Sequence, residues 1–138
     1  MALELKFNIE GGDFTRAGYA SSQIKKVLKK LNLEPKNIKR LVVALYEAEV
    51  NVVAHAYRGV VHVIIDTSYI RVKVSDEGPG ISDIPRAMTA GYSTASKEVR
   101  EMGFGAGMGL SNISKNTDEL NITSVVGEGT VLTFSNYF

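Results

Sequence analysis

The sequence predicts a two-layer α/β sandwich of the α+β type, in which helices cover one face of a mixed but mostly antiparallel sheet. Two observations support this. Four of the five strand-like segments form pairs joined by short turns, and such pairs lie antiparallel. The element order is strand–helix–helix–strand–strand–loop–helix–strand–strand. Because helices and single strands do not alternate as in βαβ units, a doubly wound parallel sheet is disfavoured.

Composition narrows the class of protein. The chain of 138 residues suits a single domain spanning residues 1–138. Its net charge of +1 gives no electrostatic reason to expect a nucleic acid or a membrane surface as partner. It has no cysteine, which excludes disulfides and thiolate metal sites. No apolar run reaches the roughly 18 residues of a membrane span, and no signal-peptide pattern is present, so a cytoplasmic protein is expected.

The N-terminal third predicts one strand and two helices. Apolar residues alternate with polar ones over residues 3–9, as in a strand. Asp13 is expected to cap a first helix that runs to about Leu31 and carries four solvated lysines, at positions 25, 26, 29 and 30. Pro35 opens a second helix, which runs to about Tyr57 and is ended by Arg58-Gly59.

The rest of the chain predicts two hairpins separated by a long loop and a short helix. Strands over 61–65 and 70–74 flank the turn 66–68, and strands over 120–126 and 131–134 flank Gly127-Glu128-Gly129. Between the hairpins, residues 81–107 look irregular or only partly helical, and a short helix follows over 109–117. A loop of that length inside a domain is usually functional, often a lid.

Three polar side chains share one face of the second helix. Glu47, Asn51 and His55 follow one another at a spacing of four residues. The Asn51 amide oxygen suits Mg²⁺, and Glu47 could act as a base one turn away. A hydrogen-bonded helix pair or simple exposure would explain the same pattern. Glu49 points to another side and is expected at the surface, while His55 is expected to be a core histidine.

Two glycine-rich segments complete the candidate site. Asp76 follows a strand and could accept a hydrogen bond from adenine N6, with Gly78 and Gly80 allowing close approach of the backbone to the ring. The run 103–109 opens the short helix and could bind phosphate through its N–H groups. It lacks the strand context of a dinucleotide fingerprint and the lysine of a Walker A loop. A plain turn and a hinge loop are the alternative interpretations.

Four motifs in this order resemble those of the GHKL ATPases, whose fold is the Bergerat or HATPase type. Glu47 to Asn51 resembles the N box, Asp76-x-Gly78-x-Gly80 the G1 box, residues 103–110 the G2 region, and Gly129-Thr130 the late Gly-Thr motif. The resemblance covers nearly the whole chain. Among GHKL proteins, a free-standing domain of this size is similar to the bacterial anti-sigma-factor serine kinases of sporulation and of the stress-response partner switches.

The resemblance implies ATP or ADP with Mg²⁺ as cofactors and a role for each motif. Glu47 would be the catalytic base and Asn51 the metal ligand, while Arg100 in the lid would contact the γ-phosphate. The nucleotide-binding set would comprise Asn51, Asp76, Gly78, Gly80, Gly103, Gly105, Gly107, Met108, Gly109, Leu110 and Thr130. Ser93, Thr94 and Lys97 also lie in the lid, where solvated loop residues are the alternative. Residues 95–102 are extra compared with the stress-switch kinase.

The sequence leaves three functions open. The first is a serine/threonine kinase and anti-sigma-type switch that phosphorylates a STAS-domain antagonist protein, which the presence of Glu47 favours. The second is a non-catalytic, nucleotide-gated regulator that binds a sigma factor or a regulatory phosphatase. The third is a stand-alone ATPase. The resemblance also suggests a homodimer.

Overall fold

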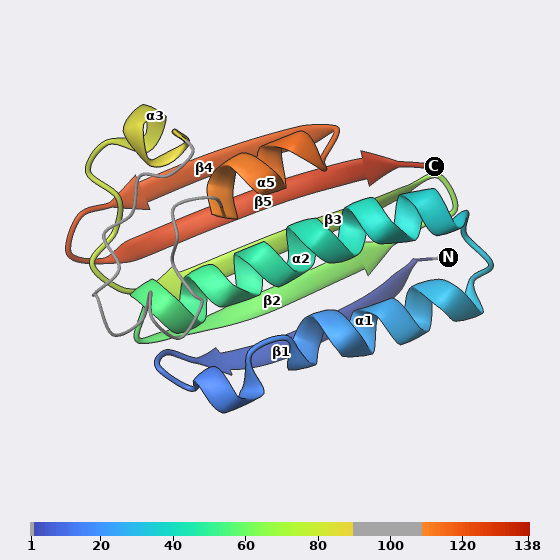
Figure 1. Ribbon diagram of the computed structural model, residues 1–138, viewed down its shortest axis with the longest axis horizontal. Coiled ribbons are helices and arrows are strands. Elements are labelled where there is room, and N and C mark those ends of the chain that lie inside the picture. Colours follow the sequence, from blue (N-terminus) through green and yellow to red (C-terminus); the bar gives the residue numbers. More distant parts are fainter. Residues whose placement is uncertain (1, 90–108) are drawn as a thin grey trace.

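The structure, a computed structural model, describes residues 2–89 and 109–138. One sheet and one layer of helices make up this part of the chain (Figure 1). The strands are β1 (Leu3–Glu10), β2 (Arg58–Ile65), β3 (Tyr69–Glu77), β4 (Glu119–Val125) and β5 (Gly129–Tyr137). The helices are η1 (Phe14–Arg16, a 3₁₀ turn), α1 (Tyr19–Lys30), α2 (Pro35–His55), α3 (Ile84–Ala87) and α5 (Gly109–Lys115).

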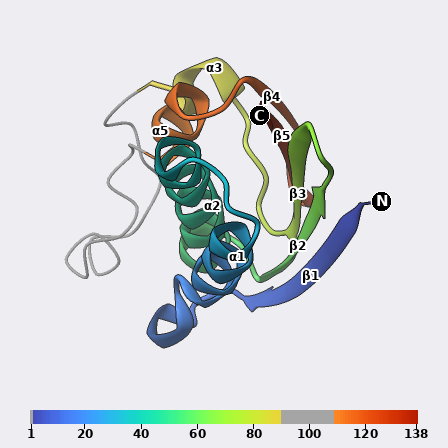
Figure 2. The same cartoon turned by 90° about the vertical axis from the view of Figure 1, so that its right-hand side faces the viewer.

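The five strands form one sheet in the order β1-β2-β3-β5-β4, and each of its four neighbouring pairs is antiparallel. Figure 2 shows α1, α2 and α5 together on one side of this curved sheet. The predicted two-layer architecture is therefore confirmed. Both predicted hairpins are present, as β2–β3 and as β4–β5.

The core lies between α2 and the central strands. Side chains alternate along each strand, so that every second one points at the helices. Val63, Val72 and Phe134 are fully buried there, opposite Leu41 and Val52 of α2. The whole of α2 is thereby held against the sheet, including the turns that carry Glu47 and Asn51.

The first helix differs from the prediction. Instead of one helix starting at Asp13, a 3₁₀ turn at 14–16 is followed by a break, and α1 begins only at Tyr19. Gly18, the residue before α1, has a φ of 94°, which lies in the left-handed region and interrupts the helix. Asp13 accepts a hydrogen bond from the Thr15 hydroxyl but caps no helix with its side chain.

The prediction that Glu49 is a surface residue is wrong. Its side chain is only 3% exposed, and it lies at the N-terminus of α1. The carboxylate accepts hydrogen bonds from the backbone N–H groups of Gly18, Ala20 and Ser21 and from the Ser21 hydroxyl. Because Gly18 has no side chain to cap α1, a residue of the neighbouring helix supplies the cap.

The end of α2 also differs in detail. The helix stops at His55, and Arg58-Gly59 already pair with Glu77 and Asp76 as the first residues of β2. The four lysines of α1 are exposed, as predicted. Within the described part of the chain, no helix has the length and apolar character needed to cross a membrane.

Candidate functional site

The start of α5 lies against the polar face of α2. A Cβ atom placed on Gly109 would be 3.0 Å from Asn51 Oδ1 and 3.3 Å from Glu47 Oε2. Glu47 and Asn51 are both partly exposed, and a glycine at 109 leaves open the space beside their oxygens. Two motifs that are about sixty residues apart in the chain therefore meet at one point.

Asn112 adds a residue that the sequence analysis missed. Its Nδ2 lies 3.5 Å from Glu47 Oε1, a long hydrogen bond between α5 and α2. Asn112 follows Gly109 by three residues, so both lie on the side of α5 that faces α2. The three-residue spacing from Gly109 was the signal in the sequence by which Asn112 could have been found. The amide supplies a donor beside the carboxylate proposed as a base.

Asp76 occupies the other end of the site, where β3 leaves the sheet. Its Oδ1 accepts a hydrogen bond of 3.0 Å from the backbone N–H of Thr130 on β5. Burial raises the pKa of Asp76 above its ordinary value of 3.8, and the Thr130 hydrogen bond opposes that rise. No described residue donates to Oδ2, the second oxygen, so Asp76 retains an acceptor for a ligand.

The loop after Asp76 is attached to the β4–β5 hairpin. Gly78 N–H donates to the Glu128 carbonyl at 3.1 Å, and Gly127 N–H donates to the Pro79 carbonyl at 2.8 Å. Gly80 has a φ of +75°, and a Cβ there would lie 2.5 Å from the Val125 carbonyl oxygen. Only glycine fits at that position, so the loop is built to lie close to the hairpin.

Ser124 is a second residue that the sequence analysis did not single out. Its hydroxyl contacts the Ile81 N–H at 2.7 Å, the Gly129 carbonyl at 3.0 Å and the Thr130 hydroxyl at 2.9 Å. It links the loop after Asp76 to both strands of the hairpin. The signal in the sequence was a polar residue in phase with Leu120 and Ile122, the inward-pointing side chains of β4.

His55 completes the polar face of α2, but its imidazole forms no hydrogen bond or ion pair with another described residue. It is partly buried, and burial lowers the pKa of its imidazole below the ordinary 6.5. The neutral form is therefore favoured. A partly buried, neutral imidazole agrees better with the expected core histidine than with a metal ligand.

Several predicted site residues lie outside the described residues. These are the lid residues Ser93, Thr94, Lys97 and Arg100, and Gly103, Gly105, Gly107 and Met108 of the glycine-rich segment. Of that segment only Gly109 and Leu110 are described. The Leu110 side chain packs against the hydrophobic core, so only its backbone could face a ligand.

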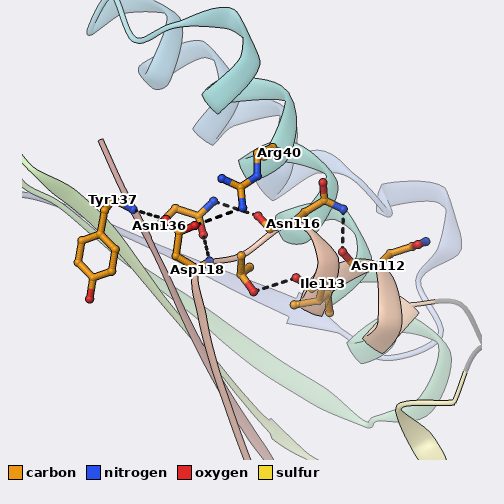
Figure 3. Close-up of polar contacts among 8 residues, drawn as sticks. Arg40, Asn112, Ile113, Asn116, Asp118, Asn136 and Tyr137 are labelled. Atoms are coloured by element: carbon orange, nitrogen blue, oxygen red, sulfur yellow. Dashed lines mark hydrogen bonds and ion pairs between the residues drawn. The ribbon is translucent and has the colours of Figure 1, made fainter.

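The far end of α5 is held by a polar network (Figure 3). The Asn116 side chain donates to the Asn112 carbonyl at 2.8 Å, and the buried Asn136 donates to the Asn116 carbonyl at 3.0 Å. Asp118 follows, accepting from the Tyr137 N–H at 2.8 Å and from Arg40 of α2 at 3.3 Å. The network ties α5 to β5 and α2, and so sets where its first residue, Gly109, lies.

The donor set fits a hard cation shared with phosphate oxygens. In the described residues no group of three or more His, Cys, Asp and Glu could hold a metal by itself. The space beside Gly109 is instead lined by the Asn51 amide oxygen and the Glu47 carboxylate. Mg²⁺ is commonly bound by one or two protein oxygens plus substrate phosphates, so these residues fit it.

Comparison with known proteins gives consistent matches. Residues 13–136 match the family model of the histidine kinase-like ATPase domain. The anti-sigma F factor of Caldanaerobacter subterraneus is 33% identical over 99 residues, which span 68% of this chain and 66% of the relative, just under two thirds of its length. The serine/threonine-protein kinase RsbT of Bacillus subtilis is 32% identical over 108 residues, 75% of each chain. The RsbU and RsbW domains of a Mycobacterium tuberculosis protein share the fold, with a TM-score of 0.65 at 17% identity over 97% of this chain and 31% of that one.

Proposed function

The chain belongs to the histidine kinase-like ATPase domain family, and from that premise we propose that it is an ATP-dependent serine/threonine protein kinase and anti-sigma-type switch. Its substrate is a hydroxyl group of a small STAS-domain antagonist protein. The observation that carries the proposal is the meeting of Glu47, Asn51 and Gly109 at one point. A protein that only senses nucleotide needs no carboxylate at this position, whereas phosphoryl transfer to a hydroxyl benefits from one.

The two ends of the site have different tasks. At the Asp76 end, the free carboxylate oxygen accepts the adenine amine, with Gly78, Gly80 and Thr130 beside the ring. At the Gly109 end, the N–H groups at the start of α5 face the phosphates, together with the glycines at 103, 105 and 107 and the backbone of 108 and 110. Asn51 would hold Mg²⁺ together with the phosphates, and the bound ion would supply positive charge against the charge that develops during transfer.

Glu47 acts as the general base, the role that distinguishes a kinase from a protein that only binds nucleotide. Its carboxylate lies one helical turn from Asn51 and accepts the proton of the attacking serine or threonine hydroxyl. Asn112 Nδ2, 3.5 Å away, orients that carboxylate from α5. Arg100, in the predicted lid, contacts the γ-phosphate in this scheme. Positioning and charge neutralisation supply most of the rate.

The proposal extends to the context of the protein. The proposed nucleotide site and catalytic carboxylate lie in one domain over residues 1–138, and the chain acts in the cytoplasm, where ATP is available. Its relatives include an anti-sigma F factor and a serine/threonine kinase, which supports a regulatory protein partner, either a sigma factor or a phosphatase. A homodimer is part of the proposal through the same family.

A non-catalytic, nucleotide-gated regulator is the second candidate, because one relative is named only as an anti-sigma factor. In that case the same site binds ATP or ADP, and the bound nucleotide decides whether a protein partner stays attached. A stand-alone ATPase is the third, and it predicts steady phosphate release without a protein substrate.

Transfer of label from γ-labelled ATP to a cognate STAS-domain protein tests the kinase. We expect wild type to phosphorylate the partner and Glu47→Gln to lose that transfer while still binding ATP, because the amide cannot take the proton. Glu34→Gln, at the exposed start of the same helix, is the matched control. Absence of transfer by wild type, with nucleotide-dependent partner binding intact, would favour the regulator instead.

A further inference from the structure

The Ser124 hydroxyl has three polar partners at the end of the proposed nucleotide site that would bind adenine. They are the Ile81 N–H at 2.7 Å, the Gly129 carbonyl oxygen at 3.0 Å and the Thr130 Oγ1 at 2.9 Å. The first comes from the loop after Asp76, and the other two come from β5. A serine hydroxyl has one proton and two lone pairs, so all three contacts can be made at once.

Counting protons leaves one arrangement. The Ile81 N–H can only donate, so it uses one lone pair of Ser124. The Gly129 carbonyl can only accept, so the Ser124 proton points to it. The contact with Thr130 must then run from the Thr130 hydroxyl to the remaining lone pair of Ser124. The reverse assignment would leave two oxygen lone pairs facing each other at the carbonyl.

The consequence concerns what the site offers to a ligand. With its proton directed at Ser124, the Thr130 hydroxyl has only lone pairs left for other partners. Its neighbour Asp76, whose Oδ1 is bound to the Thr130 N–H, offers Oδ2 as a further acceptor. In the described residues, the side chains of Asp76 and Thr130 therefore present acceptors and no donor to a base.

We propose that Ser124 is a positioning residue that makes the site selective for a purine with an amine at C6 over one with a keto oxygen there. The inference rests on the proposed binding of ATP and names how the base is chosen. The adenine amine carries two N–H groups, which the two acceptors can share. A C6 keto oxygen would place its lone pairs against the same acceptors, and nothing on Asp76 or Thr130 could donate to it.

Loss of Ser124 should relax this selection. In Ser124→Ala the Thr130 hydroxyl is released from its fixed partner and can rotate to donate. A keto base then gains a hydrogen bond, and the adenine amine loses one acceptor for part of the time. Loosening of the Ile81 loop would weaken the binding of amino and keto nucleotides alike. The ratio of the two affinities therefore isolates the effect on selectivity.

The test is the binding of ATP and of inosine triphosphate, which carries a keto oxygen at C6, measured by calorimetry with Mg²⁺ present. We expect wild type to prefer ATP by at least about 100-fold and Ser124→Ala to reduce that preference by about tenfold. Ser82→Ala, an exposed serine in the same loop, should keep the wild-type ratio. Thermal unfolding of each variant checks that it is folded.

A double-mutant cycle with Thr130→Val shows whether Ser124 acts through Thr130. In the Thr130→Val background there is no hydroxyl left to direct, so adding Ser124→Ala should leave the ratio unchanged. If wild type binds ATP and Ser124→Ala keeps its preference, the inference is overturned and the ATP site stands. An equal loss of preference in both backgrounds also overturns it. If wild type binds neither nucleotide, the proposed function fails first and the inference with it.

Discussion

Glu49 of α2 and Ser21 of α1 are joined by two hydrogen bonds, from the Ser21 N–H at 2.9 Å and from its hydroxyl at 2.6 Å, both to Oε1. The other oxygen accepts from Gly18 at 3.0 Å and from Ala20 at 3.1 Å. The carboxylate thus lies at the positive end of the α1 dipole and satisfies its first N–H groups. It anchors α1 to the helix that carries Glu47 and Asn51.

Replacing Glu49 should destabilise the fold strongly. Glu49→Gln puts an amide NH₂ where donors converge, and we expect it to lower the free energy of unfolding by about 2 kcal/mol. Glu49→Ala leaves those donors unpaired and should cost about 3 kcal/mol or more. Urea denaturation measures both. Glu47→Gln, two residues away on a partly exposed face, should stay within about 0.5 kcal/mol of wild type. Equal effects of Glu47→Gln and Glu49→Gln would contradict the capping role.

Replacing the Asp76 carboxylate should weaken nucleotide binding without unfolding the protein. Asp76→Asn can keep an oxygen toward the Thr130 N–H, but its NH₂ then faces the adenine amine. We expect ATP affinity to fall at least tenfold, about 1.4 kcal/mol, in calorimetry. Asp83→Asn, an exposed aspartate that caps α3, is the matched control. Unchanged ATP affinity in Asp76→Asn would show that the adenine ring of ATP binds elsewhere.

Replacing Gly109 by alanine should lower ATP affinity while leaving the stability of the fold nearly unchanged. In Gly109→Ala the new Cβ would lie 3.0 Å from Asn51 Oδ1, covering the oxygen proposed to bind Mg²⁺. Alanine is a better helix former than glycine, so the free energy of unfolding should change by less than about 1 kcal/mol. Mg²⁺-dependent ATP affinity should fall about tenfold. Ser114→Ala, exposed on the same helix, should leave affinity unchanged. If Gly109→Ala kept the wild-type affinity for Mg²⁺-ATP, the assignment of Asn51 as a metal ligand would be contradicted.

The stability of the protein should depend on pH through His55. Burial holds the pKa of His55 below the 6.5 of the unfolded chain, so the unfolded state binds a proton first as the pH falls. Stability contributed by neutral His55 is therefore full above pH 6.5 and decreases as the pH falls toward the lower, folded pKa. Denaturation midpoints across this range should show a shallower decline in His55→Gln than in wild type.

The motif order in the sequence was sufficient to predict the family, and the match over residues 13–136 confirms it. Strong periodicity made the strands and α2 predictable to within about three residues at either end. The predicted continuous helix from Asp13 was wrong because its apolar spacing persists through the break. The break depends on the left-handed Gly18 and on a cap from Glu49, about thirty residues away.

By itself, the sequence determined the layers of the fold and the identity of the candidate site, since Glu47, Asn51, Asp76 and the glycines carry those signals locally. Only the tertiary structure decided that Gly109 lies against Asn51, that the Ser124 hydroxyl contacts the Thr130 hydroxyl, and that Glu49 is buried. Such contacts join segments far apart in the chain. A hydrogen bond has an orientation only when both partners are placed, and that placement comes from the packing of the whole sheet against α2 and α5.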